Sequence, residues 1–162
     1  MQRQLRRLVP VAGLLLLALA LAVPAAAASQ RNFRAHLAGR EEVPPVDTRA
    51  QGQAILQFSQ DGSELSYKLI VANIENVVAA HIHCGAVGVN GPIGVTLFLG
   101  PPAGGRFDGV LAQGMTTAPD PGNACSWGDL DDVLNAILSG DTYVNVHTNP
   151  GVPSGAIRGQ IH

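Results

Sequence analysis

The chain has 162 residues, of which 14% are charged and 46% hydrophobic, with 19 glycines and 11 prolines. This composition is typical of a compact β protein with many turns. Ten Lys and Arg residues against twelve Asp and Glu residues give a formal net charge of −2. Without an excess of basic residues, the chain is a poor candidate for binding nucleic acid or an anionic membrane surface.

The N-terminus has the pattern of an export signal. Three arginines precede an apolar run over residues 8–23, and the alanines at 25–28 form a small-residue cleavage site. An uncleaved membrane anchor is the alternative, because the apolar run approaches the length that spans a bilayer. Pro24 and the alanines favour cleavage. We therefore expect a signal peptide over residues 1–28 and one secreted or periplasmic domain over residues 29–162, free of the membrane after cleavage.

Short strands are predicted along most of the remaining chain. Segments of alternating or β-branched residues predict strands over 33–38, 52–59, 64–72, 77–83, 95–99 and 110–115, and two more over 142–147 and 156–161. Asp61-Gly62 is a hairpin signal, whereas Pro44-Pro45 excludes a central strand at that point. Many short strands separated by turns predict an all-β Greek-key sandwich or barrel of about eight strands.

One short helix is predicted over residues 129–139. Its apolar residues recur with the spacing of one helical face. Ser126 with Asp129 resembles a capping box, and Gly140 provides a stop signal. The sequence therefore predicts a β fold with a single helix.

Cys84 and Cys125 are the only cysteines. An even number of cysteines in an exported chain predicts a disulfide. The alternative is that Cys84, which follows His83 directly, is a metal thiolate. The oxidising compartment and the presence of a second cysteine favour the disulfide.

Three of the five histidines, His81, His83 and His147, lie on predicted strands, at positions that place them on the polar face of each strand. Successive side chains of a strand point to opposite faces, so His81 and His83 share one face, and Tyr143, Asn145 and His147 share another. If the two strands lie close together, three imidazoles converge. They would then bind a late transition metal, copper ahead of zinc. Alternatively, their nitrogens bond to loop carbonyls and are structural.

Five segments carry a resemblance to the CHRD domain family. They are residues 42–48, 80–83, 88–92, 143–148 and 155–160. On the basis of these segments, the chain is identified as a member of that family from Phe33 to Ile161. The resemblance implies an exported, non-enzymatic binding or structural domain. An extracellular protein is the candidate partner of such a domain, but neither the partner's identity nor the oligomeric state follows from the resemblance.

A weaker similarity is to the Cu,Zn superoxide dismutases, which are Greek-key barrels. The His-x-His string, the later Val-x-Val-His strand and the closing strand are similar in pattern. This resemblance implies that His81, His83 and His147 are copper ligands, with superoxide-related redox activity. The histidine that bridges copper and zinc in that family has no clear counterpart, and the zinc-binding segment is missing, so we do not expect zinc to be bound in that manner.

Two charged residues complete the candidate site. Arg158 should point to the same side as Gln160, and we expect it to form a salt bridge with Glu41, Glu42 or Asp47. The alternative is that Arg158 guides a small anion toward the metal. Glu42, just before Pro44-Pro45, is expected to be a structural partner. No catalytic residue is predicted.

Overall fold

The computed structural model describes residues 31–101 and 104–162. The predicted signal peptide lies outside these residues. No helix in the described part is long and apolar enough to cross a membrane. The elements are β1 (Asn32–Ala38), the 3₁₀ helix η1 (Gly39–Glu41), β2 (Gln51–Phe58), β3 (Leu65–Glu75), β4 (Val77–Cys84), β5 (Ile93–Leu99), β6 (Arg106–Thr116), α1 (Leu130–Leu138), β7 (Thr142–Thr148) and β8 (Ile157–Gln160).

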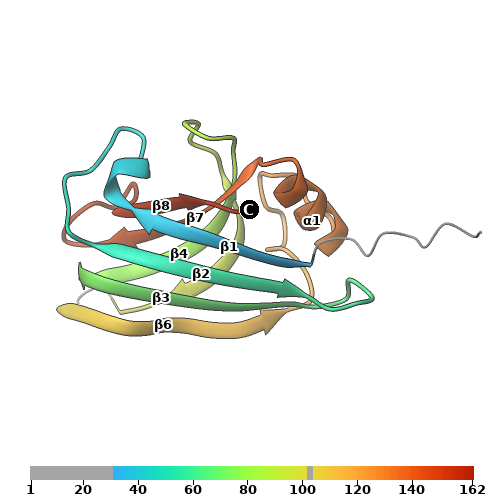
Figure 1. Ribbon diagram of the computed structural model, residues 1–162, viewed down its shortest axis with the longest axis horizontal. Helices are drawn as coiled ribbons and strands as arrows, with labels where there is room; N and C mark the ends of the chain where they lie inside the picture. Colours follow the sequence, from blue (N-terminus) through green and yellow to red (C-terminus); the bar gives the residue numbers. More distant parts are fainter. Residues whose placement is uncertain (1–30, 102–103) are drawn as a thin grey trace, which may run out of the picture.

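The strands form one antiparallel sheet that curls into a nearly closed barrel (Figure 1). Their order is β5-β4-β7-β8-β1-β2-β3-β6, so β3 and β4 follow each other in sequence but are not neighbours in the sheet. The seam lies between β5 and β6. Near it, the Tyr67 hydroxyl of β3 donates to the Leu97 carbonyl of β5 at 3.2 Å. The prediction of an all-β fold of eight strands with one helix is confirmed.

The barrel interior is filled by the apolar faces of the strands. In β2 every second residue is buried, including Ala54, Leu56 and Phe58, and the residues between them are exposed. This alternation is what a strand with one face on a core and one in water requires. By contrast, six of the seven residues of β7 are buried, on both faces of the strand. The outer face of β7 is therefore covered by something other than the barrel.

The helix α1 covers one end of the barrel (Figure 1). It buries Leu130, Val133 and Ile137 in the same core as the strands. The helix begins one residue after its predicted start, but the capping residue is Asp129 and not Ser126. The Asp129 carboxylate accepts from the Asp132 backbone N–H at 3.0 Å. An Asp at this position satisfies a free amide and faces the positive end of the helix dipole.

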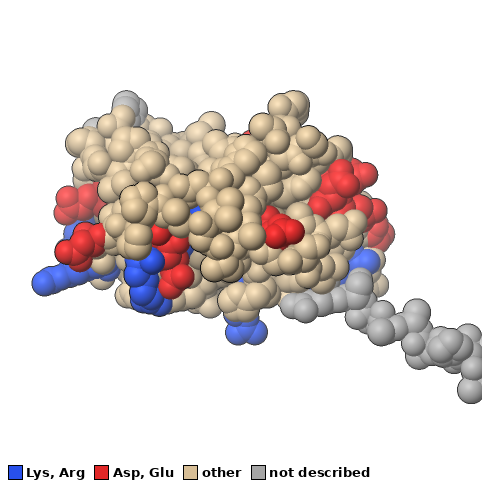
Figure 2. Space-filling view, turned by 90° about the horizontal axis from the view of Figure 1, so that it is seen from above, with Lys and Arg blue, Asp and Glu red and all other residues tan. Residues whose placement is uncertain are grey.

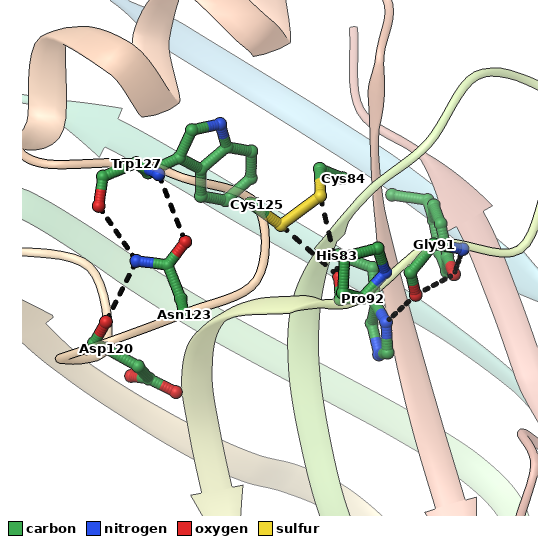
Figure 3. The surroundings of a disulfide bond; sticks show 9 residues. His83, Cys84, Gly91, Pro92, Asp120, Asn123, Cys125 and Trp127 are labelled. Carbon is green, nitrogen blue, oxygen red and sulfur yellow. Dashed lines mark hydrogen bonds between the residues drawn. A yellow bond between two sulfur atoms is a disulfide. The ribbon is translucent and has the colours of Figure 1, made fainter.

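The predicted disulfide is present between Cys84 and Cys125 (Figure 3). Cys84 is the last residue of β4, and Cys125 lies in the long segment between β6 and α1. The bond fastens that segment to the end of β4. The alternative of a Cys84 thiolate ligand is wrong in this structure, because the sulfur is bonded to Cys125.

Charged side chains are sparse on the face seen in Figure 2. Acidic residues gather toward its two ends, and most of the surface between them is uncharged. Basic groups lie singly or beside acids and do not merge into a broad patch on this face. This agrees with the absence of a nucleic-acid signature in the composition.

Candidate metal centre

The three predicted histidines come together on the outer face of the barrel. In the sheet, β4 pairs with β7, so that His81 lies opposite Asn145 and His147 lies opposite Ala79. One nitrogen of each of His81, His83 and His147 lies within 4.8 Å of those of the other two. The ring centroids are 5.0 Å apart for His81 and His147, and 5.6 Å apart for the other two pairs. We call these three residues the histidine trio.

Two rings of the trio are fixed by backbone carbonyls. His83 Nδ1 lies 2.9 Å from the Gly91 carbonyl (Figure 3), and His147 Nδ1 lies 2.9 Å from the Pro153 carbonyl. A carbonyl can only accept a hydrogen bond, so each Nδ1 carries the proton. In the neutral rings, Nε2 is then left with its lone pair, the form in which an imidazole binds a metal.

Each ring also has a buried nitrogen without a hydrogen-bond partner. These atoms are His81 Nδ1, His83 Nε2 and His147 Nε2. Buried polar atoms are rarely left without a partner in folded proteins, since the loss of water costs about 1–3 kcal/mol for each. Three such nitrogens on neighbouring rings fit a shared cation. Neutral imidazoles are ligands suited to copper, zinc and nickel.

Burial keeps the trio neutral. It lowers the pKa of His81 and of His83 to about 4, with a further lowering of the His81 pKa by the charges of the other two histidines. The pKa of His147 is lowered as well, again mainly by burial. At neutral pH the rings therefore do not have to lose a proton before they bind a metal.

A stack of side chains extends from the trio. The Tyr143 ring lies against the His83 ring with centroids 4.9 Å apart and planes 10° from parallel. On Tyr143 lies the Arg158 guanidinium, 3.4 Å from the ring centre. Tyr143 also donates to the Gly91 carbonyl at 3.3 Å, and its oxygen accepts from the Gly91 amide at 3.0 Å. Arg158 and His83 thus face opposite sides of one phenol ring.

Arg158 fixes the glycine-rich loop rather than an acid. Its Nη2 donates to the carbonyls of Ala86 and Val89 at 3.0 and 2.9 Å, and its Nη1 donates to Asn90 at 3.2 Å. The ion pairs within the described residues are Arg40–Glu41 and Arg106–Asp108, so the expected salt bridge of Arg158 is not among them. With 2% exposure, the side chain is closed to solvent.

Glu42 directly follows η1, and its side chain lies beside Asn145. It is 5% exposed, and its Oε2 accepts from the Asn145 amide at 3.4 Å. Burial raises the pKa of Glu42 to about 7, while the Asn145 bond and the Arg158 charge lower it. Its Oε1 has no hydrogen-bond partner. Glu42 is therefore a buried acid that interacts with Arg158 at a distance rather than as a contact pair.

Sequence reasoning missed two polar residues around the trio. Asn90 links two loops, because it accepts from Arg158 and donates to the Val43 carbonyl at 2.7 Å. Asp120 accepts from the amide and hydroxyl of Thr96 at 3.0 and 2.6 Å. Asp120 lies in a proline-rich segment without periodicity, where no sequence signal pointed to it. The Asn90-Gly91-Pro92 string did mark a turn.

The family model of the CHRD domain matches residues 33–161. The chain belongs to the CHRD domain family. Membership supports a binding or structural module, and together with the disulfide it fits an extracellular domain. No curated protein and no solved structure matches the chain.

Proposed function

We propose that this CHRD domain is a copper-binding module whose ligands are the histidine trio. The observation that carries the proposal is the set of three buried nitrogens without partners on rings that lie together. Copper is favoured over zinc, because a given set of nitrogen ligands binds divalent copper more tightly than its neighbours in the first transition series.

The residues around the trio have defined tasks in this proposal. The Gly91 and Pro153 carbonyls set the tautomers of His83 and His147 and fix their rings. A hydrogen-bond acceptor on the other ring nitrogen fixes the orientation of a metal-binding histidine and raises the basicity of the nitrogen that binds the metal. When bound, copper would supply one-electron redox chemistry. Superoxide-related activity stays a prediction from the weaker resemblance, and assays of superoxide consumption by the copper-loaded protein test it.

A purely structural role for the trio is the second candidate. The two carbonyl contacts favour it, because they connect the barrel to the loops that contain Gly91 and Pro153. This role accounts for one nitrogen on each of two rings. It does not explain why His83 Nε2, His147 Nε2 and His81 Nδ1 are buried without a hydrogen-bond partner.

Export of the domain is part of the same proposal. The basic, apolar and alanine-rich pattern of residues 1–28 supports a cleaved signal peptide. N-terminal sequencing of the protein from the cell envelope and the culture medium tests it. We expect a new N-terminus close to residue 29, and an intact leader would contradict export by cleavage.

The test of copper binding is elemental analysis after exposure to copper or zinc and removal of free ion. We expect about one copper per wild-type chain and less zinc. His81→Leu is the first variant, because His81 Nδ1 has no hydrogen bond to lose. It should abolish copper retention while circular dichroism and thermal unfolding stay those of a folded domain.

His36→Ala is the matched control, because His36 is an exposed histidine on β1, outside the trio. It should retain copper like the wild type. A folded wild type that retains no metal would contradict the proposal and leave the trio with a purely structural role. The search would then turn to extracellular protein partners. Equal retention by wild type and His81→Leu would place the metal elsewhere.

A further inference from the structure

Arg158 places a permanent positive charge inside the protein, close to the trio. The guanidinium is 2% exposed and is fixed by two carbonyls and by Asn90. It lies 3.4 Å from the centre of the Tyr143 ring, which in turn lies 4.9 Å from the centre of the His83 ring. The charge is therefore within about 8 Å of His83, with an aromatic ring rather than water between them.

Asp120 places a negative charge on another side of the trio. Its carboxylate is held on β5 by the amide and hydroxyl of Thr96 at 3.0 and 2.6 Å, and its own amide donates to Gly94 at 2.9 Å. In the sheet, Thr96 lies directly opposite His81. The Asp120 charge also acts on the His81 pKa, which it raises.

We propose that Arg158 and Asp120 set the charge state of copper bound at the trio, with Arg158 favouring Cu(I) and Asp120 favouring Cu(II). The inference deepens the proposed function and rests on it. Neither residue belongs to the trio. Each acts on the metal by its charge, Arg158 from across the Tyr143 ring and Asp120 from its place beside Thr96 of β5. The couple is Cu(II) plus one electron to give Cu(I), so only the charge of the ion changes.

The physical reason is Coulomb's law in a medium from which water is partly excluded. A fixed positive charge disfavours Cu(II) more than Cu(I), because the repulsion grows with the charge of the ion. The path of about 8 Å ends at the centre of the His83 ring, and a metal bound to that ring would lie farther from Arg158, at about 10 Å. At that distance and an effective dielectric constant of about 20, one unit charge changes the equilibrium about tenfold or somewhat more. Tenfold in a one-electron couple is about 59 mV.

The experiment is a redox titration of the copper-loaded protein, with ascorbate as reductant and ferricyanide as oxidant. The signal is electron paramagnetic resonance of Cu(II). At about pH 6 the Glu42 carboxyl, with a pKa of about 7, is mostly protonated and adds little charge. We expect Arg158→Gln to lower the reduction potential by about 59 mV, which is tenfold in the Cu(I) to Cu(II) ratio. Asp120→Asn should raise it.

Two controls separate charge from structure. Arg158→Lys keeps the charge and should keep a potential closer to the wild type than Arg158→Gln does. Asp120→Asn has nearly the shape of Asp120 and tests the proposal even if Arg158→Gln does not fold. Shifts in the same direction for both neutral variants, or no shift in either, would overturn the inference.

Elemental analysis of the same samples distinguishes the two proposals. About one copper per chain with unchanged potentials contradicts the role of the two charges and leaves copper binding intact. If the wild-type protein retains no copper after loading, the proposal of copper binding itself is contradicted.

Discussion

The two halves of the barrel treat their outer faces differently. On β1, β2 and β3 most outward side chains are exposed, and burial alternates along β1 and β2. On β4, β7 and β8 nearly every residue is at least partly buried, and the outward ones are polar, among them His81, His83, Asn145 and Arg158. The outer face of the β1-β2-β3 half is therefore exposed to solvent. The outer face of the β4-β7-β8 half consists of polar side chains, and loops cover it.

The difference shows where this fold places its chemistry. Burial of histidine, arginine and glutamate costs free energy unless each finds partners. Loops that cover the β4-β7-β8 half supply carbonyls as partners, from residues 85–91 and from Pro153. What remains without a partner is concentrated in the trio and in the pair Glu42 and Asn145.

The largest expected effect comes from removing the cation of the covered half. Arg158→Met would leave the Val89 carbonyl and Asn90 Oδ1 without a donor, and it would remove one of the two donors to the Ala86 carbonyl. We expect a loss of about 4 kcal/mol in the free energy of unfolding. Arg34→Met, on the exposed face of β1, should cost no more than about 0.5 kcal/mol. Urea unfolding of both variants measures the contrast. Equal losses would mean that the covered face is no more critical than the exposed one.

The disulfide ties the long segment before α1 to the covered half. Replacing both Cys84 and Cys125 by serine releases a link between residues 41 apart in sequence. We expect a loss of about 3 kcal/mol, because the unfolded chain gains the freedom of an open loop. Urea unfolding of the double variant measures it, with the reduced wild type as control. The idea fails if the oxidised wild type and the variant unfold at the same urea concentration.

The pH dependence of stability separates the buried acid from the buried histidines. The folded-state pKa of His81 and His83 is about 4 against 6.5 unfolded, so stability should fall as pH drops from 6.5 to 4. Glu42 acts in the opposite sense. Its pKa of about 7 against 4.5 means that its contribution is present below pH 4.5 and is lost as pH rises through 7.

Glu42→Gln therefore removes only the second effect. In the metal-free protein, its stability should rise more steeply than that of the wild type between pH 4.5 and 7, and should exceed it above pH 7. Thermal unfolding across this range at constant ionic strength measures the two profiles. Parallel profiles would show that the Glu42 carboxyl titrates alike in the folded and unfolded chains.

The smallest effect compares two members of the trio. His81→Leu removes a buried nitrogen without a partner, so the metal-free protein should gain up to about 1 kcal/mol. His83→Leu removes the bond to the Gly91 carbonyl and should lose about 1–2 kcal/mol. Urea unfolding without metal measures both. A loss in His81→Leu as large as that in His83→Leu would indicate that His81 also stabilises the fold.

Much of the fold could be predicted because alternation is a local signal. The strands and the helix start within a few residues of the predicted positions, and Asp61-Gly62 does connect β2 to β3. The meeting of His81, His83 and His147 followed from the same rule, once β4 and β7 were taken to be neighbours. The strand order that makes them neighbours is a property of the whole barrel.

The surroundings of the trio could not be predicted for a physical reason. The partners of Arg158 and His83 are backbone carbonyls, which every residue possesses, so no side-chain pattern marks them. The expected ion pair of Arg158 with an acid followed from charge alone. In the fold, the guanidinium is satisfied by the loop, and Glu42 turns to Asn145 instead.

The Gly91 carbonyl gives the site an unusual kind of mutational robustness. It accepts from both His83 Nδ1 and the Tyr143 hydroxyl, which occupies both of its lone pairs. Because the atom belongs to the main chain, no replacement at position 91 can delete it. A substitution can only displace it, and any Cβ there would collide with the Cys84 carbonyl. The protonation of the His83 ring thus depends on the path of the main chain at Gly91 and not on a side chain that a mutation could remove.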